Sequence, residues 1–219
     1  MLAKNNEKNL FWDDTKSSKK LEKSLKNNQI SIVETDTICG FLANITKESF
    51  EQLHSLKKDR QKNKPFLVLI NSQKKLKNFI NINSLTPQLK KLIANCWPGP
   101  LTIIFEAKND LDTFLKSQKN TIALRCPSHK DLQTILKEFD GLFSTSANKA
   151  GKPAPKDLVD VDKDILEQVT YLLHDQKKEP KSQKPSTIID CSEKKVKIIR
   201  HGTYKIEQLE KYYGSKFEK

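Results

Sequence analysis

The sequence lacks the features that define several large classes of protein. It has no apolar run near the roughly 18–20 residues of a membrane helix, and its densest run, residues 66–70, has the length of a strand. With 6 glycines and 9 prolines in 219 residues, it is neither collagenous nor of low complexity. The first ten residues are rich in Asn and Lys and lack the apolar segment of a secretory signal. These absences predict a globular cytoplasmic protein with no membrane partner.

The four cysteines and four histidines form none of the spacings typical of metal sites. Cys39, Cys96, Cys126 and Cys191 are far apart and include no C-x-x-C pair, and no two histidines stand four residues apart. Four cysteines could pair in three ways, but a cytoplasmic chain of this size rarely forms disulfides. We therefore expect reduced cysteines and no metal site made purely of protein ligands.

Charge is plentiful and unbalanced. The 40 Lys and Arg exceed the 27 Asp and Glu, which gives a formal net charge of +13. Such an excess favours phosphates or nucleic acid as partners. The lysines are spread along the chain, and the ten phenylalanines lie in apolar segments rather than in a base-stacking motif. We therefore predict weak, sequence-independent binding of tRNA or other RNA that falls steeply with salt.

Helical and strand patterns alternate along the chain, which predicts an α/β protein with an open, twisted, parallel or mixed sheet and flanking helices. We assign residues 1–14 to an N-terminal extension, 15–213 to one domain and 214–219 to a C-terminal tail. Thr46, Thr86 and Ser128 are predicted helix N-caps. The predicted helices are residues 17–26, 46–58, 73–80, 87–95, 128–139 and 204–212. The predicted strands are residues 30–33, 66–70, 101–106, 121–125, 142–144, 169–173, 187–191 and 196–199.

Two polar segments beside predicted strands are candidates for a ligand site. The first, residues 34–40 (ETDTICG), leaves the end of strand 30–33, where open α/β sheets bind their ligands. The hydroxyls of Thr35 and Thr37 would face one side of an extended chain and could bind a small polar ligand such as an amino acid. Taken alone, an ordinary turn that closes a strand is the simpler explanation.

The second segment, residues 57–65 (KKDRQKNKP), holds five basic side chains and one acid. Cations at the end of a helix complement its dipole, so a solvated helix end is one interpretation. The density of charge favours a second interpretation, in which Lys58, Arg60 and Lys64 surround an anion such as a phosphate or carboxylate. The chain has no Walker-type or Gly-x-Gly-x-x-Gly run, so phosphate binding would depend on these side chains.

Three other segments and one arginine complete the set of sequence features considered for the site. Residues 96–102 (CWPGPLT) predict a rigid turn with a scaffolding role. Residues 144–148 (STSAN) and 184–190 (KPSTIID) place hydroxyl and amide groups beside strands, although polar loops of no function would do the same. Arg125 interrupts an apolar strand and needs a partner, for which an anionic ligand and a protein carboxylate are equally suitable.

Together these segments resemble the YrdC-like family, in its short, single-domain form. Seven motifs follow in the family's order over roughly residues 30–203. They are Thr-Asp-Thr with a later Gly (35–40), Lys-x-Arg with Lys-Pro (58–65), Trp-Pro-Gly-Pro-Leu-Thr (97–102), Arg-x-Pro (125–127), Ser-Thr-Ser-Ala-Asn with a later Gly (144–151), Pro-Ser-Thr-Ile-Ile-Asp (185–190) and Arg-x-Gly (200–202).

The resemblance implies a twisted sheet with helices around a basic cavity, and an activity. The implied enzyme is a nucleotidyltransferase, threonylcarbamoyl-AMP synthase, which converts L-threonine, bicarbonate and ATP to threonylcarbamoyl-AMP and pyrophosphate. The product serves N6-threonylcarbamoyladenosine formation in tRNA, so a protein of the tRNA threonylcarbamoyl transfer machinery is an implied partner. Mg²⁺ would accompany ATP, with no protein ligand assigned.

The resemblance also implies roles for individual residues. Catalytic roles fall to Lys58 and Arg60. Contacts with threonine or carbonate fall to Thr35, Thr37, Arg125, Ser146 and Ser186. Contacts with ATP fall to Arg60, Lys64, Thr121, Ser144, Asn148 and Arg200. The chain departs from the family pattern at Glu34 and Cys39, where relatives usually carry Pro and Tyr, and no general base is evident.

Two other functions compete with this one. A non-catalytic RNA-binding protein could use the same basic cavity, which explains the charge but not the hydroxyl-rich segments or Arg125. A carbamoyl transfer to a protein acceptor could use the same fold, but it usually comes with additional domains.

Overall fold

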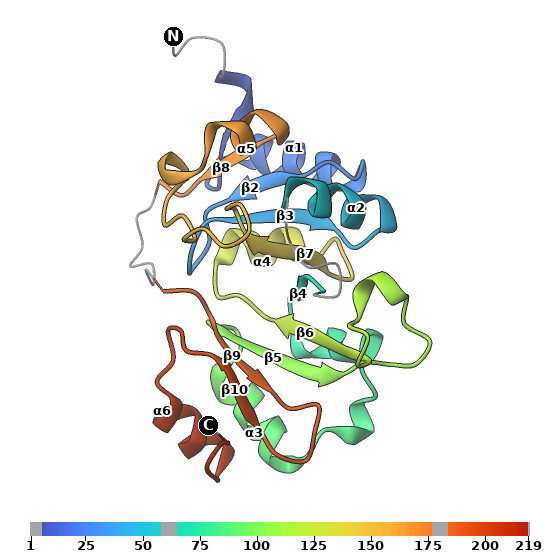
Figure 1. The fold of residues 1–219 in the computed structure, drawn as a ribbon. Coiled ribbons are helices and arrows are strands. Elements are labelled where there is room, and N and C mark those ends of the chain that lie inside the picture. Colours follow the sequence, from blue (N-terminus) through green and yellow to red (C-terminus); the bar gives the residue numbers. More distant parts are fainter. Residues whose placement is uncertain (1–5, 58–64, 177–183, 219) are drawn as a thin grey trace.

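The computed structural model of the chain describes residues 6–57, 65–176 and 184–218 (Figure 1). Ten strands of these residues form one sheet that mixes parallel and antiparallel neighbours, as the sequence predicted. In sheet order they are β1 (Asn9–Phe11), β8 (Leu172–His174), β2 (Ser31–Val33), β3 (Gly40–Asn44), β7 (Leu142–Ser146), β4 (Leu67–Leu69), β6 (Thr121–Arg125), β5 (Leu101–Glu106), β9 (Thr187–Asp190) and β10 (Lys197–Arg200).

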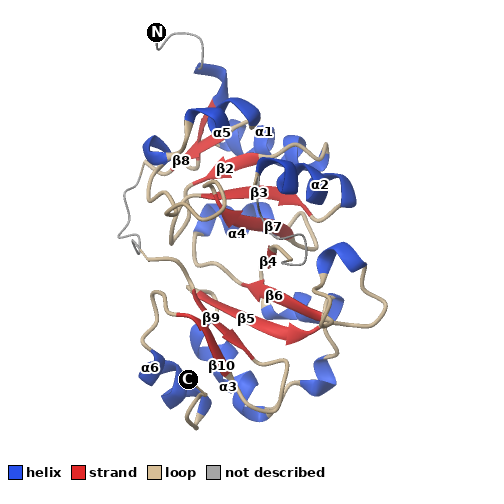
Figure 2. Cartoon of the chain, viewed as in Figure 1, coloured by secondary structure: helices blue, strands red, loops and turns tan. Residues whose placement is uncertain are grey.

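Helices flank this sheet on both faces (Figure 2). No helix among the described residues is long and apolar enough to span a membrane. The α-helices are α1 (Thr15–Lys26), α2 (Lys47–Leu56), α3 (Pro87–Cys96), α4 (Lys130–Leu136), α5 (Lys163–Gln168) and α6 (Ile206–Tyr213). The 3₁₀ turns are η1 (Asn6–Lys8), η2 (Gln73–Asn78), η3 (Ile82–Ser84), η4 (Thr113–Leu115) and η5 (Leu158–Asp160).

The sheet separates two hydrophobic layers of unequal size. On one face, α1 and α4 bury Leu21, Leu25 and Leu132 against β1, β8, β2, β3, β7 and β4. On the other face, α2, α3, α5 and α6 build the larger layer, which includes Leu53 and Ile93. Within the described residues, the smaller layer takes no side chain from β5, β6, β9 or β10. That half of the sheet is therefore left uncovered by apolar packing on the α1–α4 side.

Strand alternation decides which side chains face this uncovered half. Val68, Ile103, Leu124 and Ile189 point into the larger layer. Because successive side chains of a strand point to opposite faces, their neighbours on β4, β5, β6 and β9 point to the α1–α4 side. All of those neighbours except Asp190 line a cavity there.

The predicted helix N-caps are confirmed at Thr46 and Thr86 and wrong at Ser128. The hydroxyls of Thr46 and Thr86 accept hydrogen bonds from backbone N–H groups in the first turns of α2 and α3. Helix α4 begins two residues later than predicted, with His129 as its cap. Ser128 instead donates to the carboxylate of Asp36, a contact across 92 residues that no local pattern reveals.

The strands predicted at 101–106 and 121–125 are confirmed with the same bounds, and the helix predicted at 73–80 is the 3₁₀ turn η2. Strands β1 and β3 were not predicted. Strand β1 pairs in parallel with β8, and Trp12 beside it is buried and donates from Nε1 to the carbonyl of Glu34 at 2.9 Å. Part of the segment that we assigned to an N-terminal extension thus belongs to the sheet.

Candidate functional site

A cavity of about 510 Å³ lies on the uncovered half of the sheet. This volume is in the range typical of pockets for small molecules. Strands β3, β4, β5, β6, β7, β9 and β10 all contribute to its lining. The lining includes eight of the site residues predicted from the sequence: Thr35, Thr37, Thr121, Arg125, Ser144, Ser146, Ser186 and Arg200.

The cross-strand register sorts the lining into polar and apolar rows. Arg125 on β6 lies opposite Thr102 on β5, and Ser186 beside β9 bonds to the hydroxyl of Thr102 at 2.8 Å. Two residues away on each of these antiparallel strands, Ala123 of β6 lies opposite Ile104 of β5. A polar row therefore runs beside an apolar one, which suits a ligand with a charged part and a flat apolar part.

Arg125 is buried at the inner end of the cavity and has a protein carboxylate as its partner. Its Nη2 donates to Asp36 Oδ1 at 2.7 Å, its Nη1 to the hydroxyl of Thr37 at 3.0 Å and its Nε to the carbonyl of Gly99 at 3.1 Å. A guanidinium has five N–H groups, so two remain for a ligand. One of the two partners that the sequence left open, a protein carboxylate, is therefore present.

Asp36 is held ionised by these contacts. Burial alone would raise the pKa of Asp36, but the charge of Arg125 and two hydrogen bonds from Ser128 outweigh it and hold the pKa below its ordinary value. Sequence reasoning placed Asp36 inside a motif but gave it no role. Its role requires a partner 89 residues away, which a reading of local patterns does not supply.

Arg200 faces the same cavity from β10. Its Nε and Nη2 donate to the carbonyl of Ser186 at 3.1 and 2.9 Å, and Nη2 also lies 3.1 Å from the Ser186 hydroxyl. Burial and the nearby charge of Arg125 lower the pKa of Arg200, although an arginine keeps its charge in any case. Two like charges that repel each other across a cavity favour an anion between them.

The hydroxyls of Thr35 and Thr37 lie on one side of the chain, as predicted. Their oxygens are 3.2 Å apart, and both residues are buried. Thr35 also donates to the carbonyl of Ile38 at 3.0 Å, which closes the turn in the manner of the simpler explanation. The segment is therefore both a turn and a wall of the cavity.

Asn148 belongs to a network behind the cavity and is not part of the lining. Its Oδ1 accepts from the Ser146 hydroxyl at 2.5 Å and from the ammonium of Lys57 at 2.9 Å, and its amide nitrogen donates to the carbonyl of Lys152. Asn148 thus shapes the loop that presents Ser146.

Lys57 is a site-forming residue to which sequence analysis gave no individual role. Only 4% of it is exposed, and its ammonium donates to the carbonyls of Ser146 and Asn148 at 2.8 and 2.6 Å. A buried lysine is rare unless it is well bonded. The local pattern points the other way: Lys57 follows Leu56 at the end of an amphipathic helix, where a solvated cation is expected.

The two departures from the family pattern have different consequences. Glu34 is buried and its carboxylate accepts from the backbone N–H of Asp175 at 2.7 Å and of Leu158 at 3.5 Å. It therefore joins three chain segments and is not among the residues that line the cavity. Cys39 does line the cavity, and its backbone pairs with Pro155 and Ala147.

Four predicted site residues remain, together with the question of a metal site. Lys58, Arg60 and Lys64 lie outside the described residues. Thr121 lies in the lining, where its hydroxyl is 2.7 Å from that of Ser117. Across residues 6–57, 65–176 and 184–218, no three His, Cys, Asp or Glu side chains form a group that could hold a metal ion.

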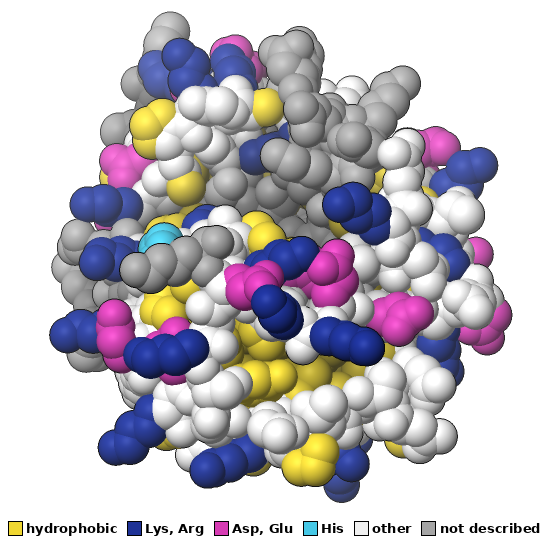
Figure 3. Space-filling view, turned by 60° about the horizontal axis from the view of Figure 1, so that its bottom comes forward, with side chains coloured by type: hydrophobic (Ala, Val, Ile, Leu, Met, Phe, Trp, Pro, Cys, Tyr) yellow, Lys and Arg dark blue, Asp and Glu magenta, His cyan; other side chains and the backbone are white. Residues whose placement is uncertain are grey.

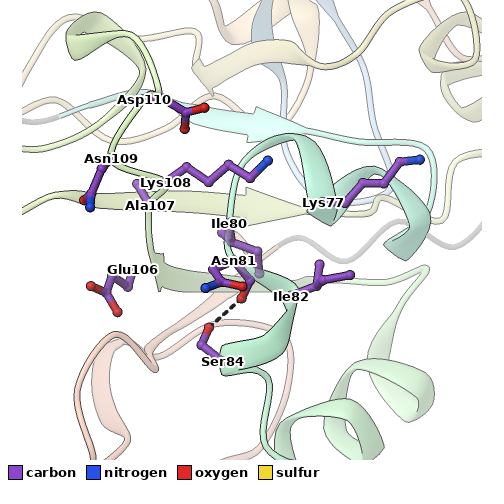
Figure 4. Close-up of a pocket in the computed structure, with 10 residues that line it drawn as sticks. All are labelled: Lys77, Ile80, Asn81, Ile82, Ser84, Glu106, Ala107, Lys108, Asn109 and Asp110. Carbon is purple, nitrogen blue, oxygen red and sulfur yellow. Dashed lines mark hydrogen bonds between the residues drawn. The ribbon is translucent and has the colours of Figure 1, made fainter.

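A second pocket of about 490 Å³ lies beside η3 and the end of β5 (Figure 4). Its lining carries charges of both signs, with Lys77 and Lys108 against Glu106 and Asp110. It contains none of the predicted site residues.

Figure 3 shows that basic side chains are scattered over the face in view and interspersed with acidic ones.

Comparison with known proteins relates this geometry to one family. Residues 23–202 match the Sua5/YciO/YrdC family model, which is described as telomere recombination. The chain is 32% identical over 192 residues to a protein of Methanocaldococcus jannaschii that is provisionally named threonylcarbamoyl-AMP synthase. That match covers 86% of this chain and 87% of the relative.

Solved structures agree on the fold. The structure of Pyrococcus abyssi Sua5 complexed with L-threonine is similar with a TM-score of 0.84 at 20% identity. That similarity covers 95% of this chain and 61% of the Sua5 chain. The structure of Escherichia coli YciO has a TM-score of 0.76 at 18% identity and covers 92% of this chain and 97% of its own.

The ion pair at the inner end of the cavity gives a prediction about stability. Replacing Asp36 by Asn should lower the free energy of unfolding by about 3 kcal/mol at pH 7, because it leaves a buried guanidinium without a counter-charge. Since the folded-state pKa of Asp36 is lowered, its contribution is complete above about pH 4 and is lost as pH falls through that pKa. Urea unfolding at pH 7 and pH 3 measures the difference between wild type and variant, which should shrink at pH 3. An equal difference at both pH values, or an equal loss in the exposed control Asp13→Asn, would contradict the prediction.

A second prediction concerns the buried ammonium. Lys57→Met should cost about 1–3 kcal/mol of stability, since it removes the donor from three buried or half-buried acceptors. Lys57→Arg should recover part of the loss because a guanidinium can still donate to them. The exposed control Lys47→Met should leave urea unfolding unchanged within about 0.5 kcal/mol. A Lys57→Met variant as stable as that control would show that these bonds contribute nothing.

Proposed function

The chain belongs to the Sua5/YciO/YrdC family, and from that premise we propose that it is a threonylcarbamoyl-AMP synthase. In this reaction the amino nitrogen of L-threonine bonds to the carbon of bicarbonate, a C–O bond of bicarbonate breaks, and water leaves to give N-carboxy-threonine. An oxygen of the new carboxylate then bonds to the α-phosphorus of ATP, and the bond from that phosphorus to the β-phosphate oxygen breaks. The products are threonylcarbamoyl-AMP and pyrophosphate.

The chemistry asks the protein for position and charge more than for a general base. N-carboxy-threonine is labile in water, so it must be held close to the α-phosphate until the bond forms. Negative charge builds up on the phosphates as pyrophosphate leaves, and fixed positive charge stabilises it. The two guanidiniums of Arg125 and Arg200 facing one hydroxyl-lined cavity support this proposal most directly.

We assign the inner end of the cavity to threonine and carbonate. Arg125 has two N–H groups left for a carboxylate, and Thr35 and Thr37 offer hydroxyls beside it. Ser146 and Ser186 lie in the same lining and can bond to the carbonate oxygens or to the threonine carboxylate. The named complex of Pyrococcus abyssi Sua5 with L-threonine supports threonine as the amino acid.

We assign the rest of the cavity to ATP. Arg200 would face the phosphates, and Thr121 and Ser144 would bond to the nucleoside or the phosphate oxygens. Lys58, Arg60 and Lys64 are expected to add charge from a segment outside the described residues, with catalytic roles for Lys58 and Arg60. Asn148 would act on Ser146 and would bind ATP only if it exchanged its present hydrogen bonds. Mg²⁺ would arrive with the phosphates, and we expect its remaining ligands to be water.

We further propose that a protein of the tRNA threonylcarbamoyl transfer machinery receives the product. Threonylcarbamoyl-AMP is a reactive mixed anhydride, so direct transfer would protect it from hydrolysis. Because ATP and tRNA are both needed, we expect the reaction to take place in the cytoplasm. Mixing the purified protein with a candidate acceptor and tracing labelled threonine into tRNA would test this.

The activity gives a prediction about which substrates the reaction needs. The protein should release pyrophosphate from ATP only when both L-threonine and bicarbonate are present, which a pyrophosphate-coupled assay measures. Thr37→Val keeps the shape but removes a hydroxyl, so it should raise the KM for threonine about tenfold while changing the KM for ATP little. Equal pyrophosphate release without threonine would exclude the proposed reaction.

The dispersed charge gives a prediction about RNA. Exposed lysines attract phosphates by releasing counterions, so tRNA binding should be weak, blind to sequence and mostly lost above about 0.2 M salt. ATP binding should persist, because its site is buried and combines charge with hydrogen bonds. Filter binding of tRNA and ATP across a salt series measures both. Tight, salt-resistant binding that distinguishes one tRNA from another would favour the RNA-binding protein instead.

A further inference from the structure

Strand β10 contains an irregularity at the rim of the cavity. Ile198 is paired with Ile189 of β9, and Arg200 is paired with the preceding residue, Ile188. Ile199 is thus an extra residue between two pairs, which is the arrangement of a β-bulge. In a regular strand, neighbouring side chains point to opposite faces, but here Ile199 and Arg200 both line the cavity.

The bulge leaves a large apolar side chain in solvent. Ile199 is 53% exposed, whereas Ser186, to which the neighbouring Arg200 donates, is 3% exposed. Arg200 is itself exposed beside Ile199 at the mouth, and its guanidinium reaches from there to the buried Ser186. Among the described residues, two other large apolar side chains are exposed, Ile82 and Val159, and neither lines this cavity.

Ile199 continues the apolar row of the cavity. Ile188 on β9 and Ile104 on β5 lie on the adjacent strands and line the same space. The row therefore runs from the sheet interior to the open edge, with Arg200 beside its outer end. A ligand that covered this row would remove Ile199 from water, which is favourable in proportion to the apolar area buried.

We propose that Ile199 is a substrate-binding residue that packs against the purine base of ATP at the mouth of the cavity. This rests on the proposed function, in which ATP is the substrate with a large, flat apolar part. Threonine and bicarbonate are small and polar and suit the hydroxyls and Arg125 further in. With the base packed on Ile199, the phosphates would lie beside Arg200 and extend inward toward Arg125.

The test separates the base from the phosphates. Isothermal titration with ATP, adenosine and inorganic triphosphate is carried out on wild type and on Ile199→Ser. We expect Ile199→Ser to weaken ATP and adenosine about tenfold and to leave triphosphate unchanged, because only the base loses its contact. The KM for ATP should rise by the same factor while the KM for threonine stays constant. Ile199→Val should remain within about threefold of wild type.

Val159→Ser is the matched control, since Val159 is 88% exposed and lies outside the cavity. It should leave all three affinities unchanged, and both serine variants should melt at the wild-type temperature because neither side chain is buried. Unchanged ATP affinity in Ile199→Ser, or an equal loss of affinity for ATP and for triphosphate, would overturn only the proposed role of Ile199. Failure of the wild type to bind ATP at all would instead overturn the proposed function.

Discussion

The ion pair between Arg125 and Asp36 connects the two parts of the molecule that the cavity separates. Arg125 ends β6, in the half of the sheet without apolar cover, and Asp36 lies in the turn between β2 and β3, in the half that α1 and α4 cover. The Asp36 carboxylate also receives two hydrogen bonds from Ser128, just before α4. Without this pair, the inner wall would consist of loops joined only by weaker contacts. A buried charge pair adds little net stability, but it fixes the position of each partner.

The fixed position of Arg125 has a consequence for ligand binding. Asp36 balances the charge of Arg125, but two N–H groups of the guanidinium remain available to donate to a ligand. Arg200 adds a second positive charge, and it is close enough to Arg125 for the charge of Arg125 to lower the pKa of Arg200. The inner cavity therefore keeps a net attraction for anions even though a carboxylate is built into its wall. Dispersed surface lysines cannot do the same, because they are solvated and many are paired, as with Lys26 and Glu22.

Much of the fold could be predicted from the sequence because its signals are local. The β-branched and apolar residues of 101–106 and 121–125 and the threonine caps of α2 and α3 are signals that depend on neighbours within a few residues. Strand β3 escaped prediction because residues 40–44 are almost entirely buried and show no alternation. Strand β1 is short and depends on pairing with β8, more than 160 residues later.

The residues of the site likewise divide into those that local sequence signals reveal and those that they do not. Hydroxyls and arginines within motifs could be assigned from the sequence, and eight of them line one cavity. Asp36, Lys57 and Ile199 could not, because their roles depend on partners far along the chain or on a bulge in the pairing of β10. The bulge is the clearest case: a regular β10 would turn either Ile199 or Arg200 away from the cavity. One extra residue in the ladder brings an apolar contact and a charge to the same mouth, as a nucleotide with its base and phosphates requires.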